Sequence, residues 1–182
     1  MNPVALRTAL GLAWLAFWVG WLLLARWSKQ GRSAGARIPA ALPLIVVVVI
    51  LAHAFKGRSL AVDALAVQIV GIALFAGGLG IAIWARFVLG RNWGMPMTLK
   101  DEPELVTSGP YRRVRHPIYT GILLALLGTA LATYLYWLIA LAGMAAYFVY
   151  CARVEERLMG AAFPSAYPGY RARTKMLIPF VL

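Results

Sequence analysis

Long apolar runs alternate with short polar segments along the chain, and the lengths of these runs predict membrane-spanning helices. A helix needs about 20 predominantly apolar residues to cross the hydrocarbon core of a bilayer, where unpaired backbone amides are very costly. Three runs in the first half of the chain reach or approach this length: Leu6 to Ala25, Ile38 to Phe55 and Leu65 to Leu89. The sequence therefore predicts three transmembrane helices in this half.

A fourth apolar run, from Ile118 to Val149, is too long for one upright span, because a helix of its roughly 32 residues would be about 48 Å long. Small and polar residues interrupt the run where a tight turn would join two antiparallel helices: Gly128, Thr129, Thr133, Tyr134 and Tyr136. We therefore expect a hairpin of two short spans. The predicted fold class is all-α, a polytopic membrane helix bundle of about five transmembrane helices.

The third span is rich in glycine, a residue that lets neighbouring helices approach closely in a membrane. Gly71, Gly77, Gly78 and Gly80 are predicted to form a small-residue packing face. Leucine at position 77 is accordingly expected to disrupt helix packing.

The polar segments divide the chain into two parts. Residues 1–85 are predicted to hold the N-terminal transmembrane helices, the third of which continues to about residue 89. Residues 86–182 hold the hairpin, a polar loop from Gly90 to Pro117 and a polar tail from Arg153 to Lys175. We expect any catalytic site to lie in this C-terminal region.

Composition supports a membrane environment. Hydrophobic residues make up 62% of the chain and charged residues 13%, whereas soluble domains are roughly 45–50% apolar and about 25% charged. The net charge of +12 does not require a nucleic-acid partner, since cations beside apolar spans are explained by membrane topology and anionic lipid headgroups. A single cysteine and two histidines predict neither a disulfide nor a metal site.

The distribution of cations predicts the orientation in the membrane. Fifteen Lys and Arg residues fall on one set of loops, whereas the opposite side holds three, namely Arg7, Lys56 and Arg58. Lys and Arg are concentrated in cytoplasmic loops. We therefore expect an integral membrane protein with its N-terminus outside and its C-terminus in the cytoplasm, where the polar loop and tail share one face.

Several residues of the loop and tail suggest chemistry. Gly109 and Pro110 predict a turn that leaves backbone amides free for a ligand. His116 precedes Pro117 at the start of the fourth span, where free helix N–H groups attract anions. Glu155 and Glu156 are costly near membrane depth unless they are paired or functional. Without a specific motif, an ordinary loop with arginines on lipid phosphates would explain much of this pattern.

The order of these residues is more specific. The sequence contains Gly109-Pro110-Tyr111, then Arg115-His116-Pro117-Ile118-Tyr119-Thr120-Gly121, then Glu155-Glu156 and a terminal series of Phe163, Tyr167, Tyr170 and Pro179. This pattern resembles the isoprenylcysteine carboxyl methyltransferase family, most closely its short prokaryotic members, over about half of the chain. The short length suggests a prokaryotic source, and we therefore expect the protein in a prokaryotic cytoplasmic membrane.

The resemblance implies an S-adenosylmethionine-dependent methyltransferase whose cofactor-binding lobe faces the cytoplasm. The implied cofactor-binding residues are Lys100, Leu105, Val106, Gly109, Tyr111, His116, Tyr119 and Glu155. Arg153 and Glu156 would be catalytic and would orient a lipophilic acceptor, such as the carboxylate of an isoprenylcysteine-like substrate. A carboxylate needs no general base, whereas an amine or thiol would have to lose a proton, and the sequence leaves the acceptor open.

Two alternatives belong to other functional classes. The Arg-His-Pro motif also occurs in membrane sterol reductases that bind NADPH, although these usually carry Arg-Asp-Glu where this chain has a pair of glutamates. A lipid-binding membrane protein without catalytic activity is the other alternative. The sequence does not indicate an oligomeric state.

Overall fold

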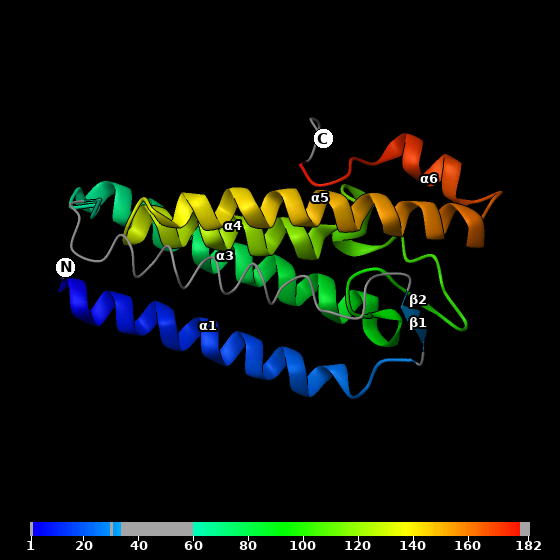
Figure 1. The fold of residues 1–182 in the computed structure, drawn as a ribbon, viewed down its shortest axis with the longest axis horizontal. Helices are drawn as coiled ribbons and strands as arrows, with labels where there is room; N and C mark the ends of the chain where they lie inside the picture. The colour runs from blue at the N-terminus through cyan, green and yellow to red at the C-terminus, as the bar shows by residue number, and fades with distance from the viewer. Residues whose placement is uncertain (1, 30, 34–59, 179–182) are drawn as a thin grey trace.

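The computed structural model describes residues 2–29, 31–33 and 60–178. Its long helices lie side by side and the polar segments gather at one end (Figure 1). The second predicted span, residues 38–55, lies outside the described residues, as does Pro179 of the terminal motif. The division of the chain at residue 86 stays a prediction.

The apolar runs form helices close to the expected boundaries. Helix α1 spans Pro3–Ala25, α3 spans Leu65–Leu89, α4 spans Pro117–Ala132 and α5 spans Trp137–Ala162. Helix α1 begins where the side chain of Asn2 accepts hydrogen bonds from the backbone N–H groups of Val4 and Ala5, a common N-cap arrangement. Within the described ranges, α1, α3 and α5 are long and apolar enough to cross a membrane, which confirms the predicted helical membrane fold.

The predicted hairpin is confirmed, with its turn between Ala132 and Trp137. Helix α4 has 16 residues and is therefore only about 24 Å long. Helix α5 does not end near Val149 but continues to Ala162, because the polar residues that follow include good helix formers such as Arg, Glu and Leu. The first ten residues of the expected polar tail are thus helical.

Helices α3 and α4 pack against each other through glycines. A Cβ atom at Gly78 would lie 2.5 Å from the carbonyl oxygen of Gly121, and one at Gly71 would lie 2.8 Å from that of Gly128. Gly71 and Gly78 are seven residues apart, which places them two turns apart on the same helix face. Among the described residues, no atom lies within 4 Å of such a Cβ position at Gly77 or Gly80. The prediction that Gly77 and Gly80 belong to the close packing face is therefore wrong, because both point away from α4.

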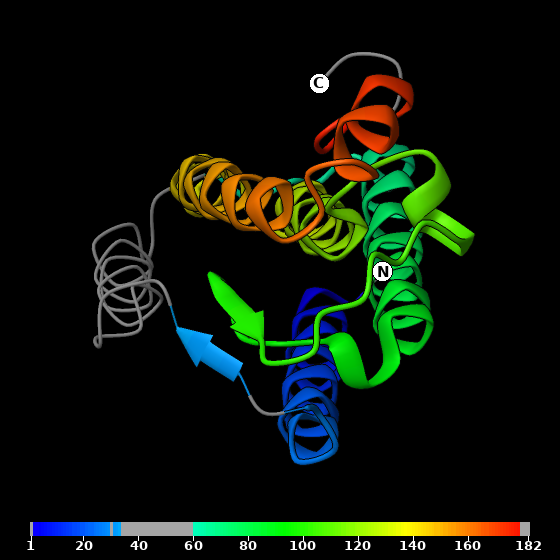
Figure 2. The same ribbon diagram turned by 90° about the vertical axis from the view of Figure 1, so that its right-hand side faces the viewer.

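Short elements form the polar end of the bundle. Strand β1, Gly31–Ser33, pairs antiparallel with β2, Thr98–Lys100, so that Gly31 lies opposite Lys100. Two 3-10 turns, η1 at Gly90–Asn92 and η2 at Gly109–Arg112, flank β2 in the sequence, and α6 spans Tyr167–Arg173. Seen along the bundle, the ribbon lies across from α5, and α6 lies beyond α4 and α5 (Figure 2). The helices thus bring the polar loop and the C-terminal segment to one end.

Candidate functional site

A cavity of about 550 Å³ opens at the polar end of the bundle. Its wall combines residues of α1, the ribbon, the loop before α4, and helices α4, α5 and α6. The wall includes seven of the residues that the motif resemblance implicated: Lys100, Leu105, Val106, Tyr111, His116, Tyr119 and Glu155. The structure therefore brings together residues that lie up to 55 positions apart in the sequence.

Glu155 forms the polar centre of the cavity wall. Its Oε1 atom accepts a hydrogen bond of 2.9 Å from the backbone N–H of Met97 and one of 2.6 Å from the hydroxyl of Tyr119. Its Oε2 atom lies 3.3 Å from Nδ1 of His116. Met97 has a φ of 61°, an uncommon conformation for a residue with a side chain that is found often at functional sites. The residue before β2 and the start of α4 thus fix one carboxylate of α5.

His116 precedes the first turn of α4 and is held between two carboxylates. Its ring stacks on Tyr119 with 5.5 Å between centroids, and Tyr119 stacks on Phe148 of α5 at 4.3 Å. Burial lowers the pKa of His116, but the hydrogen bonds and charges of Glu155 and Glu156 outweigh burial, so that the pKa is raised. The imidazole is therefore favoured in its protonated form.

Glu156, the next residue on α5, faces a different group of residues and is absent from the cavity wall. Its carboxylate lies 2.6 Å from Nε of Arg115, and the two side chains are 6% and 9% exposed. Arg115 also donates hydrogen bonds to the backbone carbonyls of Arg171 and Thr174. Glu156 therefore links α5 to the loop before α4 and, through Arg115, to the C-terminal segment.

The C-terminal segment closes one side of the cavity. Tyr167 and Tyr170 of α6 contribute to the wall, and the hydroxyl of Tyr170 donates a hydrogen bond of 2.8 Å to the carbonyl of Tyr111. Burial raises the pKa of Tyr170 to about 12, so the hydroxyl keeps its proton for this bond. Thr120 donates a further bond of 2.6 Å to the carbonyl of Leu177. These contacts hold α6 and the following residues against the loop and α4.

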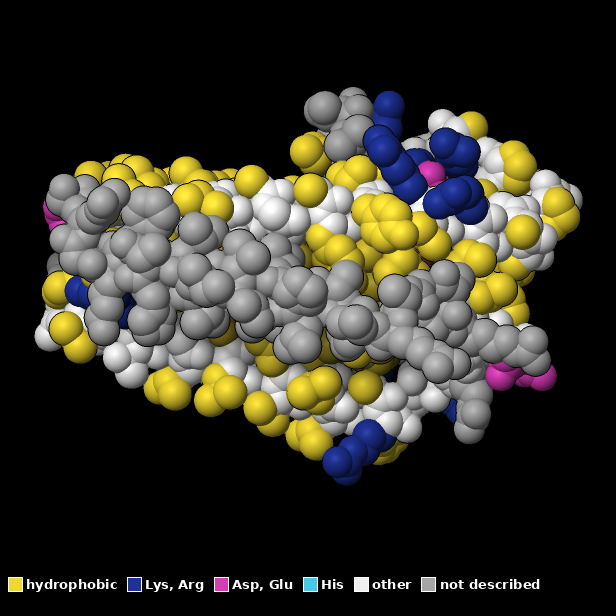
Figure 3. Space-filling model, viewed as in Figure 1, with side chains coloured by type: hydrophobic (Ala, Val, Ile, Leu, Met, Phe, Trp, Pro, Cys, Tyr) yellow, Lys and Arg dark blue, Asp and Glu magenta, His cyan; other side chains and the backbone are white. Residues whose placement is uncertain are grey.

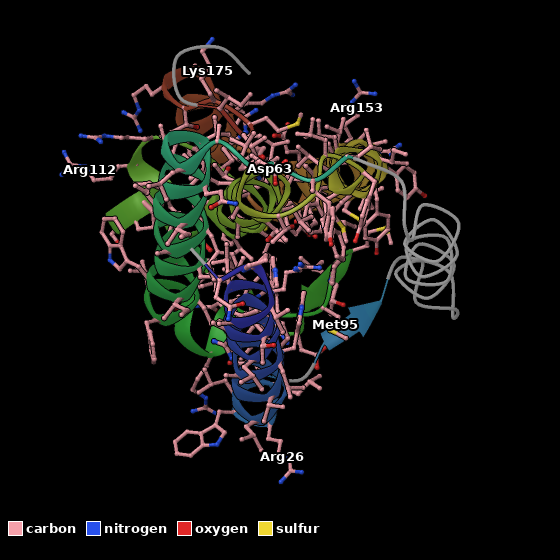
Figure 4. All side chains as sticks on the ribbon, turned by 90° about the vertical axis from the view of Figure 1, so that its left-hand side faces the viewer. Arg26, Asp63, Met95, Arg112, Arg153 and Lys175 are labelled. Atoms are coloured by element: carbon pink, nitrogen blue, oxygen red, sulfur yellow. The ribbon has the colours of Figure 1, made fainter. Side chains whose placement is uncertain are left out.

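Three other implicated residues differ in their positions. Lys100 is 8% exposed, and its ammonium group donates a hydrogen bond of 2.5 Å to the carbonyl of Lys29. Burial and the nearby charge of Arg86 lower the pKa of Lys100. Gly109 lies outside the cavity wall and has a φ of +56°, with Val88 within 3.0 Å of a Cβ position, so its role is to form the turn. Arg153 is exposed and points away from the bundle (Figure 4).

Much of the cavity wall is apolar and was not identified from the sequence. Aromatic and methionine side chains make up a large part of it, including Trp18, Trp21, Trp93, Met97, Met144, Tyr147 and Phe148. In the sequence, the tryptophans of α1 have the spacing of interfacial or helix-packing residues. Their place in a cavity wall depends on Trp93, whose ring packs 5.7 Å from that of Trp21, and no local pattern predicts that contact.

A family model, several protein sequences and a solved structure are similar to this chain. A family model described as phospholipid methyltransferase matches residues 66–166. The cobalt-zinc-cadmium resistance protein CzcN of Cupriavidus metallidurans is 33% identical over 111 residues, covering 59% of this chain and 50% of that protein. Methanethiol S-methyltransferase of a Pseudomonas species is 30% identical over 117 residues, covering 59% of this chain and 45% of that protein. The chain thus spans about half the length of these relatives.

A second methanethiol S-methyltransferase, from Bradyrhizobium diazoefficiens, is 42% identical over 69 residues, which cover 38% of this chain and 26% of that protein. Among solved structures, the eukaryotic intramembrane Ras methyltransferase ICMT (isoprenylcysteine carboxyl methyltransferase) superposes with a TM-score of 0.64 at 21% identity, covering 81% of this chain and 55% of that chain. At this level of identity the likeness shows a shared fold.

Proposed function

Because the chain belongs to the phospholipid methyltransferase family, we propose that it transfers a methyl group from S-adenosylmethionine to a lipophilic acceptor at the membrane. The family and the fold agree with the resemblance inferred from the sequence motifs. The observation that carries the proposal is the cavity at the polar end of the bundle, because its wall combines Glu155, His116 and Tyr119 with a large apolar surface.

The residues present fit the proposed cofactor. The cavity of about 550 Å³ lies within the range of roughly 300–1,000 Å³ that is typical of sites for small molecules. The Nε2 atom of His116 is buried and lies 3.6 Å from Oε1 of Glu156, whereas the Nδ1 atom faces Glu155 of the cavity wall at 3.3 Å. Glu155 and the rings of Tyr119 and Phe148 provide an environment that favours a positively charged group.

The polar part of the wall is the proposed cofactor site. Leu105, Val106, Tyr111, His116, Tyr119 and Glu155 would hold S-adenosylmethionine, with Lys100 at its edge. When bound, this cofactor supplies an electrophilic methyl group on a positively charged sulfur. The chain's own residues then have to align two ligands and exclude water from between them. The stacked rings of His116, Tyr119 and Phe148 give the wall the rigidity that such alignment needs.

The apolar part of the wall is the proposed acceptor site. Trp18 and Leu22 of α1 line the cavity and are also 41% and 59% exposed, which provides an apolar path between the cavity and the hydrocarbon core. Met144 and Phe148 continue this surface from α5. An isoprenylcysteine-like carboxylate remains a candidate acceptor. The orientation of this carboxylate by Arg153 stays a prediction, because the side chain of Arg153 is exposed and lies outside the cavity wall.

The cavity is proposed to face the cytoplasm, with the N-terminus of α1 outside. The bundle supports this orientation because the loop before α4, the end of α5 and α6, which together carry most of the described cations, lie at the same end (Figure 1). A reporter fused to Leu182 that is active only in the external compartment would contradict it.

Binding measurements in detergent test the proposed cofactor. Calorimetric titration should show saturable binding of S-adenosylhomocysteine and none of NADPH. Glu155→Gln removes the charge that contacts Met97, Tyr119 and His116, and we expect it to weaken this binding at least tenfold. Glu102→Gln is the matched control, because its side chain is exposed and lies outside the cavity wall. Binding of NADPH alone, or equal affinity in both variants, would contradict the assignment.

The acceptor is tested by transfer of radiolabel. Membrane extracts are incubated with purified protein and methyl-labelled S-adenosylmethionine, and the labelled product is separated by chromatography. We expect label in a lipophilic fraction that is missing when Glu155→Gln replaces the wild type. Label confined to water-soluble products would contradict a lipophilic acceptor.

A further inference from the structure

A band of exposed cations runs along the outer face of α5 and onto α6. It consists of Arg153 and Arg157 of α5, Arg171 and Arg173 of α6, and Lys175 after α6, and we call it the basic band. Lys and Arg side chains gather over this part of the surface (Figure 3). None of these five residues lines the cavity.

The positive charge of the basic band is largely uncompensated. From residue 153 to the C-terminus the sequence contains two acidic residues, Glu155 and Glu156. Glu155 contacts Met97 and Tyr119 at the cavity, and Glu156 is buried against Arg115. Within the described parts of the chain, Arg171 is the one member of the band near a carboxylate, at 3.6 Å from Glu156.

The outer face of α5 shows the depth at which the band begins. Ala142 and Ala146 are exposed on this face, followed by Tyr150, which is 57% exposed. Tyrosines of this kind mark the boundary between hydrocarbon and headgroups. Arg153 and Arg157 follow about 4.5 and 10.5 Å further along the helix axis. The headgroup layer of one leaflet is about 5–8 Å thick, so the band starts at headgroup depth.

We propose that the basic band is a docking surface for the anionic phospholipid headgroups of the membrane that holds the protein. Guanidinium groups bind phosphate oxygens bidentately, and long arginine side chains reach from a helix into the headgroup layer. The excess of Lys and Arg in cytoplasmic loops that sets membrane topology does not require these side chains to lie close to one another. In this case, the cations of α5 begin at headgroup depth, and Arg171 of α6 lies 3.6 Å from Glu156, the residue that precedes Arg157 on α5.

The docking surface bears on the cavity through α6. Arg171 and Arg173 lie on the exposed side of this helix, whereas Tyr167 and Tyr170 on its other side are buried and line the cavity. A headgroup bound between α5 and α6 would hold α6 against the bundle. This inference goes beyond the proposed methyl transfer and does not depend on it.

The test is lipid binding by the full chain purified in a neutral detergent. Dioctanoyl phosphatidylglycerol and dioctanoyl phosphatidylcholine are titrated separately, and the bound lipid is counted by native mass spectrometry. The test variant, Arg157→Gln with Arg173→Gln, removes two charges from the band without changing Arg153. The matched control, Arg26→Gln with Arg91→Gln, removes two exposed cations near the ends of α1 and α3.

We expect preferential binding of phosphatidylglycerol by the wild type. One cation near an anionic surface contributes roughly fivefold to binding, so the test variant, which lacks two cations, should bind this lipid about 25-fold more weakly. The control variant should bind it like the wild type. Equal loss in both variants, or no preference for phosphatidylglycerol, would overturn the docking surface.

Glycerol phosphate serves as a soluble probe of the same chemistry. If it competes as well as the lipid, the band is a site for free phosphate compounds and the membrane assignment is wrong. S-adenosylhomocysteine titration of both variants runs in parallel. If the test variant loses lipid binding but keeps cofactor binding, the docking surface is supported independently of the cofactor site. If the wild type binds lipid but not S-adenosylhomocysteine, the proposed function fails and this inference stands.

Discussion

The buried ion pair between Arg115 and Glu156 gives the sharpest prediction about how the site is held together. Glu156→Gln keeps the shape of the side chain but removes its charge and leaves the guanidinium of Arg115 buried without its carboxylate. The pair is 2.6 Å long and its side chains are 9% and 6% exposed. Removing one partner of such a buried pair typically costs about 3–5 kcal/mol, because the remaining charge stays desolvated.

Part of this cost is offset in the present structure. Arg115 keeps its hydrogen bonds to the carbonyls of Arg171 and Thr174. The amide oxygen of the new glutamine can still accept a hydrogen bond from Nε of Arg115. We therefore expect a loss near the lower end, about 3 kcal/mol, which corresponds to a fall in Tm of roughly 6–12 °C for a chain of this size. The assay is thermal unfolding in detergent, followed by tryptophan fluorescence or by retention of the monodisperse peak after heating.

Two further variants separate the buried pair from general sensitivity to charge. Glu104→Gln breaks the exposed ion pair with Lys29 and should leave the Tm nearly unchanged. The double variant Arg115→Met with Glu156→Leu should be more stable than Glu156→Gln alone, since it removes both charges of the pair and leaves neither of them buried without its partner. The reasoning is refuted if Glu156→Gln lowers the Tm no more than Glu104→Gln does.

Two more predictions concern packing and pH. Gly78→Ala should destabilise the protein by about 1–3 kcal/mol through overpacking, because the added Cβ would lie 2.5 Å from backbone atoms of α4. Gly77→Ala should be neutral. Equal unfolding temperatures for the two variants would contradict the observed packing. The pKa of His116 is raised in the folded state by Glu155 and Glu156, which outweigh burial. The protonated His116 therefore contributes its full stabilisation at a pH below its pKa of 6.5 in the unfolded chain. This stabilisation is lost as the pH rises through the raised pKa of the folded state. Thermal unfolding of the wild type should show this decline, and His116→Gln should not; parallel pH profiles would argue against a charged His116.

The sequence determined the elements of this fold and most of the pieces of its site. Apolar run lengths located α1, α3 and the hairpin of α4 and α5, because a membrane requires long stretches with internally paired backbones. The motifs located His116, Tyr119 and the glutamate pair, since their order along the chain is specific. They could not reveal that α5 continues through Glu155 and Glu156, because helix propensity alone does not decide where a polar helix end stops.

The tertiary structure decided what each of two neighbouring residues does. Glu155 and Glu156 are adjacent, but successive residues of a helix point about 100° apart, so one carboxylate lines the cavity and the other pairs with Arg115. The same rotation separates Gly78, which packs on α4, from Gly77, which does not. Which direction is inward depends on where the other helices and the ribbon lie, including the backbone N–H that Met97 donates to Glu155. That information resides in contacts between distant segments, and no local pattern of residues contains it.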